Sequence, residues 1–262
     1  MPPRVARITI FPMKSCDGRT CLETSVTQSG ALCHDREFAM VDSTGRFINA
    51  KRTPLMHRLQ LEIEPVQRLY SVSRRDGGDP LRGQLDDHGK QLSDWLSDFF
   101  STEVSIVENN EMGFPDDTVS VGPTIVSTAT LQTVSEWFEG MPLDEVRNRF
   151  RANIEVEGVE PFWEDRLYRA DSNLQPFRVG GLVFGGSNPC QRCVVPSRDS
   201  QTGEVTPHGF AVAFGKQRET SLPVWAARER FDHFYRLTTN TQLLELGTGV
   251  IQVGDPVEII DG

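Results

Sequence analysis

The chain has 262 residues, of which 37% are hydrophobic and 24% are charged, and its formal net charge is −10. This composition is typical of a globular protein. The acidic balance argues against binding to duplex nucleic acid, which depends on Lys and Arg neutralising phosphates. No apolar run approaches the roughly 18 residues of a membrane span, and the N-terminus lacks the apolar core of a signal peptide. We therefore expect a cytoplasmic protein with no membrane partner.

Short strands dominate the pattern of the first hundred residues. Alternating stretches predict strands at 5–11, 36–41, 46–49, 59–64 and 69–73. The second and third of these strands flank a turn at 42–45, so they are predicted to form a hairpin. A helix is predicted at 90–100, where apolar residues recur at helical spacing.

The second half continues this pattern after a polar segment at 108–119, which is predicted to connect two halves of the protein. A strand at 124–126 is followed by a helix that Ser127 or Thr128 could cap. The remaining expectations are strands at 153–157, 177–179 and 182–184, a helix at 225–235, and two strands around a Gly-Asp-Pro turn within 250–260. Many short strands with few helices favour a barrel or closed β architecture with helices packed outside.

The most informative local pattern is a lone Cys-x-x-Cys, Cys190 to Cys193, with Arg192 between the thiols. The pattern favours one reactive thiolate, because an adjacent guanidinium stabilises the ionised form of a thiol. A structural zinc site needs four ligands. That alternative stays open here, because Cys16 and Cys21 could supply the other two.

Charge adds a second constraint on function. An anionic ligand must be held by a local cluster of Lys and Arg acting against the negative field of the whole chain. The chain has five cysteines, an odd number, which favours free thiols in a reducing compartment over a disulfide framework.

Seven short motifs follow one another between residues 5 and 260. They are Pro12-Met13-Lys14-Ser15, Asp35-Arg36-Glu37-Phe38, Ala50-Lys51-Arg52-Thr53-Pro54, Phe150-Arg151-Ala152-Asn153-Ile154, Glu164-Asp165, Cys190-Gln191-Arg192-Cys193 and Gly249-Val250-Ile251-Gln252-Val253-Gly254-Asp255-Pro256-Val257. In this order they resemble the motifs of proteins that join a MOSC N-terminal β-barrel domain to a MOSC domain. The resemblance implies a mainly β (α+β) fold, in which a MOSC β-barrel packs against an N-terminal β-barrel-like domain with a few peripheral helices. The implied domains are 1–118 and 119–262.

The resemblance also implies a function, that of a molybdenum enzyme similar to the mitochondrial amidoxime-reducing component and to bacterial reductases of N-hydroxylated bases. By position, Cys193 would be the catalytic residue and the metal ligand, on a molybdenum also held by the dithiolene of a pyranopterin. The implied cofactor-binding residues are Lys14, Ser15, Arg36, Lys51, Arg151, Asn153 and Arg192. Planar guanidinium groups suit a phosphate-bearing cofactor.

Two positions depart from the family pattern: Ala152 replaces a proline, and Lys51 replaces an arginine and so gives up a bidentate fork. Arg151 and Asn153, two residues apart, would share one face of a strand. Cys193 is expected to face a cleft near Lys14, Arg36 and Arg151, although these residues are far apart in the sequence.

The expected partners follow from the same resemblance. The substrate would be a small N-hydroxylated compound. The chain lacks the four-cysteine set of a ferredoxin, so electrons would come from a separate flavin or iron-sulfur protein. An alternative is a sulfur carrier that holds a persulfide on Cys193. Cys190 is expected to be a packing thiol, and Glu164-Asp165 a helix cap or a solvated pair.

Overall fold

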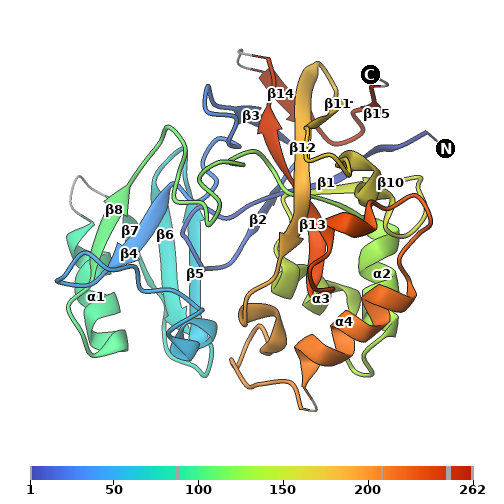
Figure 1. Cartoon of the computed structure of the whole chain (residues 1–262). Coiled ribbons are helices and arrows are strands. Elements are labelled where there is room, and N and C mark those ends of the chain that lie inside the picture. The colour runs from blue at the N-terminus through green and yellow to red at the C-terminus, as the bar shows by residue number, and fades with distance from the viewer. Residues whose placement is uncertain (1, 86–88, 208, 246–248, 261–262) are drawn as a thin grey trace.

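The computed structural model describes residues 2–85, 89–207, 209–245 and 249–260. Two parts lie side by side in Figure 1: a smaller one that carries β4 to β8 and α1, and a larger one that carries β9 to β15 and α2 to α4. Strands dominate both parts, and the prediction of a mainly β fold is confirmed. Among the described residues, no helix combines the length and hydrophobicity needed to cross a bilayer.

The larger part is built on an eight-stranded sheet with the order β15-β11-β12-β13-β9-β10-β1-β2. Its strands are β1 (Arg4–Ile10), β2 (Arg19–Cys21), β9 (Ile125–Ser127), β10 (Ile154–Glu157), β11 (Gln175–Val179), β12 (Leu182–Gln191), β13 (Arg236–Leu243) and β15 (Val257–Ile259). The Val5 amide donates to the Asp255 carbonyl at 2.9 Å, and the Val257 amide donates to the Pro3 carbonyl at 3.0 Å. These bonds join β1 to the start of β15 and close the sheet on itself, which covers the exposed edge of β15.

The start of the chain belongs to this sheet rather than to the smaller part. β1 pairs with β10, and β3 (Glu23–Val26) pairs with β14 (Gly249–Gln252) near the other end of the chain. The sheets therefore cross the predicted domain boundary, and both chain ends are tied into one β structure. This arrangement places the loop after β1 between the two parts.

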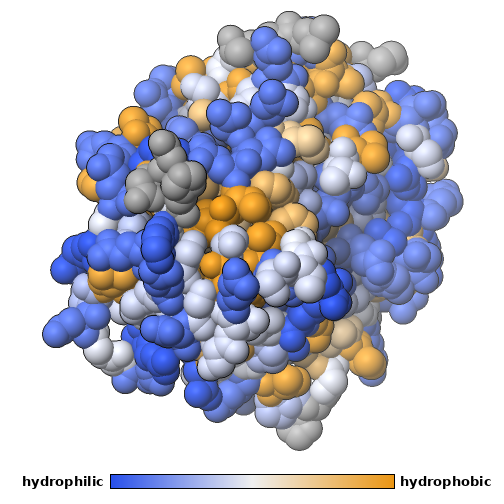
Figure 2. Space-filling view, turned by 90° about the vertical axis from the view of Figure 1, so that its left-hand side faces the viewer, coloured by the Kyte–Doolittle hydropathy of each residue, from blue (hydrophilic) through white to orange (hydrophobic). Residues whose placement is uncertain are grey.

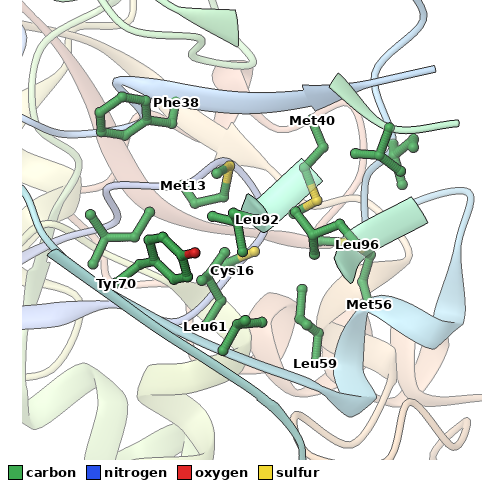
Figure 3. Close-up of a cluster of buried hydrophobic side chains, with 14 of the residues drawn as sticks. Met13, Cys16, Phe38, Met40, Met56, Leu59, Leu61, Tyr70, Leu92 and Leu96 are labelled. Atoms are coloured by element: carbon green, nitrogen blue, oxygen red, sulfur yellow. The ribbon is translucent and has the colours of Figure 1, made fainter. Parts of the chain in front are cut away.

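The smaller part contains a two-stranded sheet, a three-stranded sheet and one helix. Its elements are β4 (Phe38–Val41), β8 (Ser105–Glu108), β5 (Leu59–Glu64), β6 (Leu69–Arg74), β7 (Leu81–Gln84) and α1 (Lys90–Phe100). They enclose a core that includes Met13, Met40, Leu61, Leu92 and Leu96 (Figure 3). On the face shown in Figure 2, hydrophobic residues gather in the centre between hydrophilic ones.

Three helices pack against the larger sheet: α2 (Thr128–Glu136), α3 (Leu143–Phe150) and α4 (Phe210–Thr220) (Figure 1). Ser127, one of the two predicted cap residues, caps α2 by accepting a hydrogen bond from the Thr130 amide. The core beneath these helices includes Leu131, Phe150 and Phe214. Of the three, α3 ends directly beside the site described below.

Three predicted elements differ from the structure. The segment 225–235 forms only the short 3-10 helix η4 (Arg228–Arg230). Arg230 there donates to the carbonyls of Arg169 and Ser187, and these tertiary bonds override the helical composition. The segment 46–49 returns toward β4 by a single bridge, Val41 to Phe47, whereas the ladder partner of β4 is β8. The last two strands exist, but they pair with β3 and β11 instead of with each other.

Candidate functional site

A cavity of about 870 Å³ is lined by residues from both parts of the molecule. Of its described lining residues, eleven are Lys or Arg and four are Asp or Glu, although the whole chain carries a net charge of −10. A local positive field of this kind attracts anions despite the negative charge of the protein. Seven of the eight predicted site residues line this cavity: Cys193, Lys14, Ser15, Arg36, Lys51, Arg151 and Arg192.

The loop after β1 is fixed by backbone bonds to the segment before β4. The Lys14 amide donates to the Phe38 carbonyl at 2.7 Å, and the Arg36 amide donates to the Phe11 carbonyl at 2.8 Å. Ser15 and Arg36 both have left-handed backbone conformations, with φ of 69° and 54°. Non-glycine residues rarely adopt this conformation, and such strain concentrates at functional sites. The loop therefore holds these two residues in fixed positions at the cavity wall.

Arg151 reaches the same place from the larger part. It is the C-cap of α3, with φ of 52°, and one of its Nη atoms donates to the Cys16 carbonyl at 2.5 Å. Its guanidinium lies 4.0 Å from the ring centroid of Phe11, and that of Arg36 lies 5.5 Å from the same ring. Burial, together with the charge of Arg36, lowers the pKa of Arg151 to about 10. The guanidinium thus remains charged at neutral pH.

Asn153 is the one predicted site residue that does not line the cavity. Its side chain is 1% exposed; it accepts from the Thr124 amide at 3.1 Å and donates to the Thr9 carbonyl at 3.1 Å. The expectation of a shared strand face assumed an extended chain at Arg151. Because Arg151 is a left-handed helix cap, the alternation of strand side chains does not apply there. Asn153 instead ties β1 to the segment before β9.

The two thiols of the Cys-x-x-Cys segment are both half-buried and both line the cavity. Arg192 donates from Nη1 to the Cys190 sulfur at 3.3 Å and from Nη2 to the Phe150 carbonyl at 2.7 Å. The Cys193 sulfur accepts from the Val195 amide at 3.5 Å. The Arg192 guanidinium therefore contacts Cys190, whereas the one hydrogen bond of the Cys193 sulfur within the described residues is its long contact with the Val195 amide. This geometry leaves the Cys193 sulfur available to a ligand.

Two lysines and one aspartate form the cavity rim. Lys14 and Lys51 bind the two carboxylate oxygens of Asp116 at 2.7 and 2.8 Å. Burial opposes ionisation of Asp116, but the two ammonium groups outweigh it and hold the pKa of that carboxyl below its usual value. Burial also lowers the pKa of Lys14, and Asp116 opposes that shift. Asp116 comes from the connector at 108–119, which had no predicted role in the site.

The zinc alternative is wrong for the residues that the structure describes. Cys16 is 6% exposed and points into the core of the smaller part (Figure 3), where burial raises the pKa of its thiol. Within the described ranges, no three His, Cys, Asp or Glu side chains lie close enough to hold a metal ion. A single-thiolate site, in which a cofactor supplies the other sulfur ligands, does not require such a cluster.

Glu164 and Asp165 form neither a helix cap nor a solvated pair. They are 1% and 3% exposed. Glu164 accepts from the Ser127 amide at 3.1 Å, and Asp165 forms a buried ion pair with Arg218. This network packs behind the sheet, and none of its members lines the cavity. Its role is structural.

The chain's cations provide a test of fit to an anionic cofactor. Within the described part of the chain, three lining arginines have no carboxylate partner and bind only carbonyl oxygens or sulfur: Arg151, Arg192 and Arg198. The Nε atoms of Arg192 and Arg198 are buried and have no hydrogen-bond partner in the described ranges of the chain. Buried donors without a partner are rare in native proteins and indicate a missing ligand or water. The donor set therefore fits anionic ligands, among them a cofactor that carries a phosphate.

Comparisons with known proteins agree with this arrangement. The model of the MOSC N-terminal beta barrel domain matches residues 2–111, and the model of the MOSC domain matches residues 123–258. The chain belongs to the MOSC domain family. All eleven cavity-lining Lys and Arg residues lie within these two matched regions.

Several curated relatives of this MOSC protein carry names that refer to molybdenum or to amidoximes. It is 22% identical to molybdenum cofactor sulfurase from Homo sapiens, over 84% of this chain and 29% of the relative. The corresponding enzyme from Drosophila melanogaster is 27% identical, over 97% of this chain and 34% of the relative. Mitochondrial amidoxime reducing component 2 from Rattus norvegicus is 24% identical, over 77% of this chain and 68% of the relative. The chain thus spans about a third of the sulfurases.

Among solved structures, the YUAD protein from Bacillus subtilis matches 98% of this chain with 10% identity and a TM-score of 0.39.

Proposed function

We propose that this protein binds a molybdenum-pyranopterin cofactor and reduces small N-hydroxylated compounds with electrons from a separate donor protein. The observation that carries the proposal is the position of the Cys193 thiol, in a cavity where eleven Lys and Arg side chains gather in an acidic chain. Relatives of two kinds, named for amidoxime reduction and for molybdenum cofactor sulfuration, support a molybdenum-related role.

Under this proposal, the cavity-lining residues have separate roles in binding the cofactor. Arg36, Arg151 and Lys14 would bind the phosphate of the cofactor, because they are cations fixed in place at the junction of the two parts. Ser15 would add a hydroxyl or an amide donor beside them. Arg192 would use its unpartnered Nε toward the pterin. Lys51 would contribute charge at the rim, since 42% of its side chain is exposed and it already binds Asp116.

Cys193 would ligate molybdenum as a thiolate, a soft ligand suited to a metal that already carries sulfur. When bound, the molybdenum centre supplies the two-electron redox chemistry that removes oxygen from an N-hydroxyl group. The protein's part is to orient the substrate oxygen and to stabilise negative charge on it with guanidinium donors. Preorganised donors of this kind contribute strongly to catalysis because they need no reorganisation during the reaction.

The test uses Cys193→Ala and its matched control, Cys190→Ala, in protein made by cells able to synthesise the cofactor. Cys193→Ala should lose bound molybdenum and all reductase activity toward an N-hydroxylated purine under a chemical reductant. Cys190→Ala removes only a weak sulfur acceptor, so it should keep molybdenum and stay within about tenfold of the wild-type rate. Equal losses from both variants would point to a paired-thiol site and reject the proposed assignment.

A sulfur carrier is the second candidate, and the sulfurase names of several relatives favour it. In that case Cys193 would hold a persulfide, and the surrounding cations would stabilise its anionic form. The two functions differ in what the purified protein contains. Labile sulfane sulfur on Cys193 without molybdenum supports the carrier, whereas molybdenum with one pterin supports the reductase. A protein that is fully loaded and reduced, yet turns over no N-hydroxylated compound, would exclude the reductase.

A further inference from the structure

One section of the cavity wall is formed by two residues that lie outside the family motifs used above. His57 belongs to the 3-10 helix η1 (Pro54–Arg58) of the smaller part, and Arg198 directly follows the 3-10 helix η3 (Val195–Ser197) of the larger part. Both line the cavity. The cavity wall therefore contains both side chains, and the proposed function assigns no task to either.

Each of these side chains has a nitrogen without a partner. His57 is 9% exposed, and its Nε2 is buried and has no hydrogen-bond partner among the residues that the structure describes. Arg198 donates from Nη1 to the Ala50 carbonyl at 2.6 Å, while its Nε is buried and unpartnered. Leaving two polar nitrogens unsatisfied costs stability. Both residues line the same cavity, and the charge of Arg198 acts on His57, so one ligand that supplies oxygen atoms could satisfy both nitrogens.

Both residues are held rigidly. The backbone of η1 is fixed by Arg75, whose Nε donates to the His57 carbonyl at 3.0 Å. Gly203 packs against the imidazole, since a Cβ on this glycine would lie 3.2 Å from the His57 Cβ and Cδ2. Arg198 is anchored through Ala50. Rigid donors lose little conformational entropy on binding and so make a preorganised site.

The charges around His57 define the chemistry of the ligand. Burial, followed by the charge of Arg198, lowers the pKa of His57; Arg151 acts in the same direction, while a hydrogen bond with the Ser200 backbone and the charge of Asp199 oppose it. Arg198 has no carboxylate partner among the described residues. An anion placed between the two side chains would neutralise Arg198 and favour protonation of the imidazole. Both changes favour an oxoanion over a neutral ligand.

We propose that His57 and Arg198 form an anion-binding subsite that receives a carboxylate or phosphate group of the substrate. The inference rests on the proposed reductase function and narrows its substrates to N-hydroxylated compounds that carry such a group. A phosphate of the cofactor has the same chemistry. We favour the substrate as the ligand that brings this anionic group, because the family motifs assign neither His57 nor Arg198 to the cofactor.

The test compares benzamidoxime with its para-carboxylate as ligands for the oxidised, cofactor-loaded protein. Isothermal titration calorimetry at pH 7 without an electron donor measures binding with no turnover. The wild-type protein should bind the carboxylate at least tenfold more tightly. Arg198→Met and His57→Gln should each reduce that preference about tenfold or more, the effect of losing one charge-assisted hydrogen bond, and leave the affinity for benzamidoxime unchanged.

Arg236→Met is the matched control, because it removes the same charge from the same cavity. The Arg236 guanidinium is already engaged by Asp232 at 2.7 Å and by the Pro189 carbonyl at 2.9 Å. This variant should keep the preference for the carboxylate. An equal loss in Arg236→Met would overturn the proposal, since the preference would then reflect net charge alone.

Two further measurements separate the possible failures. Molybdenum and pterin contents of Arg198→Met should equal those of the wild type; a parallel loss of pterin would assign the subsite to the cofactor and overturn the substrate assignment. The titrations are repeated on Cys193→Ala. If Cys193→Ala still prefers the carboxylate, the subsite is supported even if the reductase function fails. If Arg198→Met and His57→Gln lose the preference while Arg236→Met and Cys193→Ala keep it, His57 and Arg198 are identified as the residues of the subsite.

Discussion

Replacing Arg218 by methionine tests whether the buried ion pair behind the sheet stabilises the fold. Arg218 is 1% exposed and forms its ion pair with Asp165, which is 3% exposed. The guanidinium lies 4.3 Å from the ring centroid of Phe162 and 5.1 Å from that of Phe231. Methionine fills similar space between these rings but leaves the Asp165 carboxylate without a countercharge.

The expected cost follows from that unpaired charge. Removing one partner of a buried ion pair typically destabilises a protein by about 3–5 kcal/mol, a large share of the roughly 5–15 kcal/mol that stabilises most domains. Burial already raises the pKa of Asp165, against the opposing effect of Arg218. Without the arginine this carboxyl can take up a proton. The cost should therefore be largest at neutral pH and smaller near pH 5.

The assay is guanidinium chloride unfolding followed by tryptophan fluorescence at both pH values. The control is Arg228→Met, whose pair with Glu219 at 3.0 Å has side chains that are 60% and 53% exposed. Exposed pairs contribute only about 0–1 kcal/mol. The double variant Arg218→Met with Asp165→Asn should recover part of the loss. If the free energies of unfolding of Arg218→Met and Arg228→Met differ by less than about 1 kcal/mol, the buried ion pair is not a source of stability.

Two other predictions concern the same region. Burial, with the charge of Asp165, raises the pKa of Glu164 from 4.5 to about 7, so its contribution to stability is full below pH 4.5 and lost as pH rises through 7. Glu164→Gln should remove about 3 kcal/mol of this pH dependence, measured as the difference between the free energies of unfolding of variant and wild type from pH 4 to 8. Gly186→Ala should fail to fold, because its Cβ would lie 1.6 Å from the Leu167 carbonyl oxygen, whereas Gly181→Ala, with nothing within 4 Å, should match the wild type in soluble yield and unfolding midpoint.

Elements with a strong local signal were predictable from the sequence. The helix at 90–100 and the Ser127 cap depend on apolar spacing and on one side chain, and both were predicted correctly. The pairing of the last strands was not predictable, because β14 and β15 bind strands that are distant in the sequence. The composition of 225–235 favours a helix, but tertiary contacts of Arg230 prevail there.

In the candidate site too, residues with a local sequence signal were predictable and residues placed by tertiary contacts were not. Five of the seven short motifs indicated residues that do line one cavity, seven side chains in all. His57, Arg198 and Asp116 carry no local pattern of this kind; only the tertiary arrangement brings them to the wall. The error at Asn153 has a local cause. A left-handed residue at 151 reversed the expected side-chain direction, and nothing in the motif announces that conformation.

The site exists only where the two parts meet, and this has a consequence for function. Arg151 of the larger part donates to the Cys16 carbonyl, and Arg198 donates to the Ala50 carbonyl. Val195, two residues after the Cys193 thiol, packs against the core of the smaller part. Each contact joins a cavity-lining segment of one part to the backbone or core of the other. Because the thiol and the cations come from both sides, neither part alone contains the donor set, and a change that loosens this junction should weaken ligand binding before it unfolds either core.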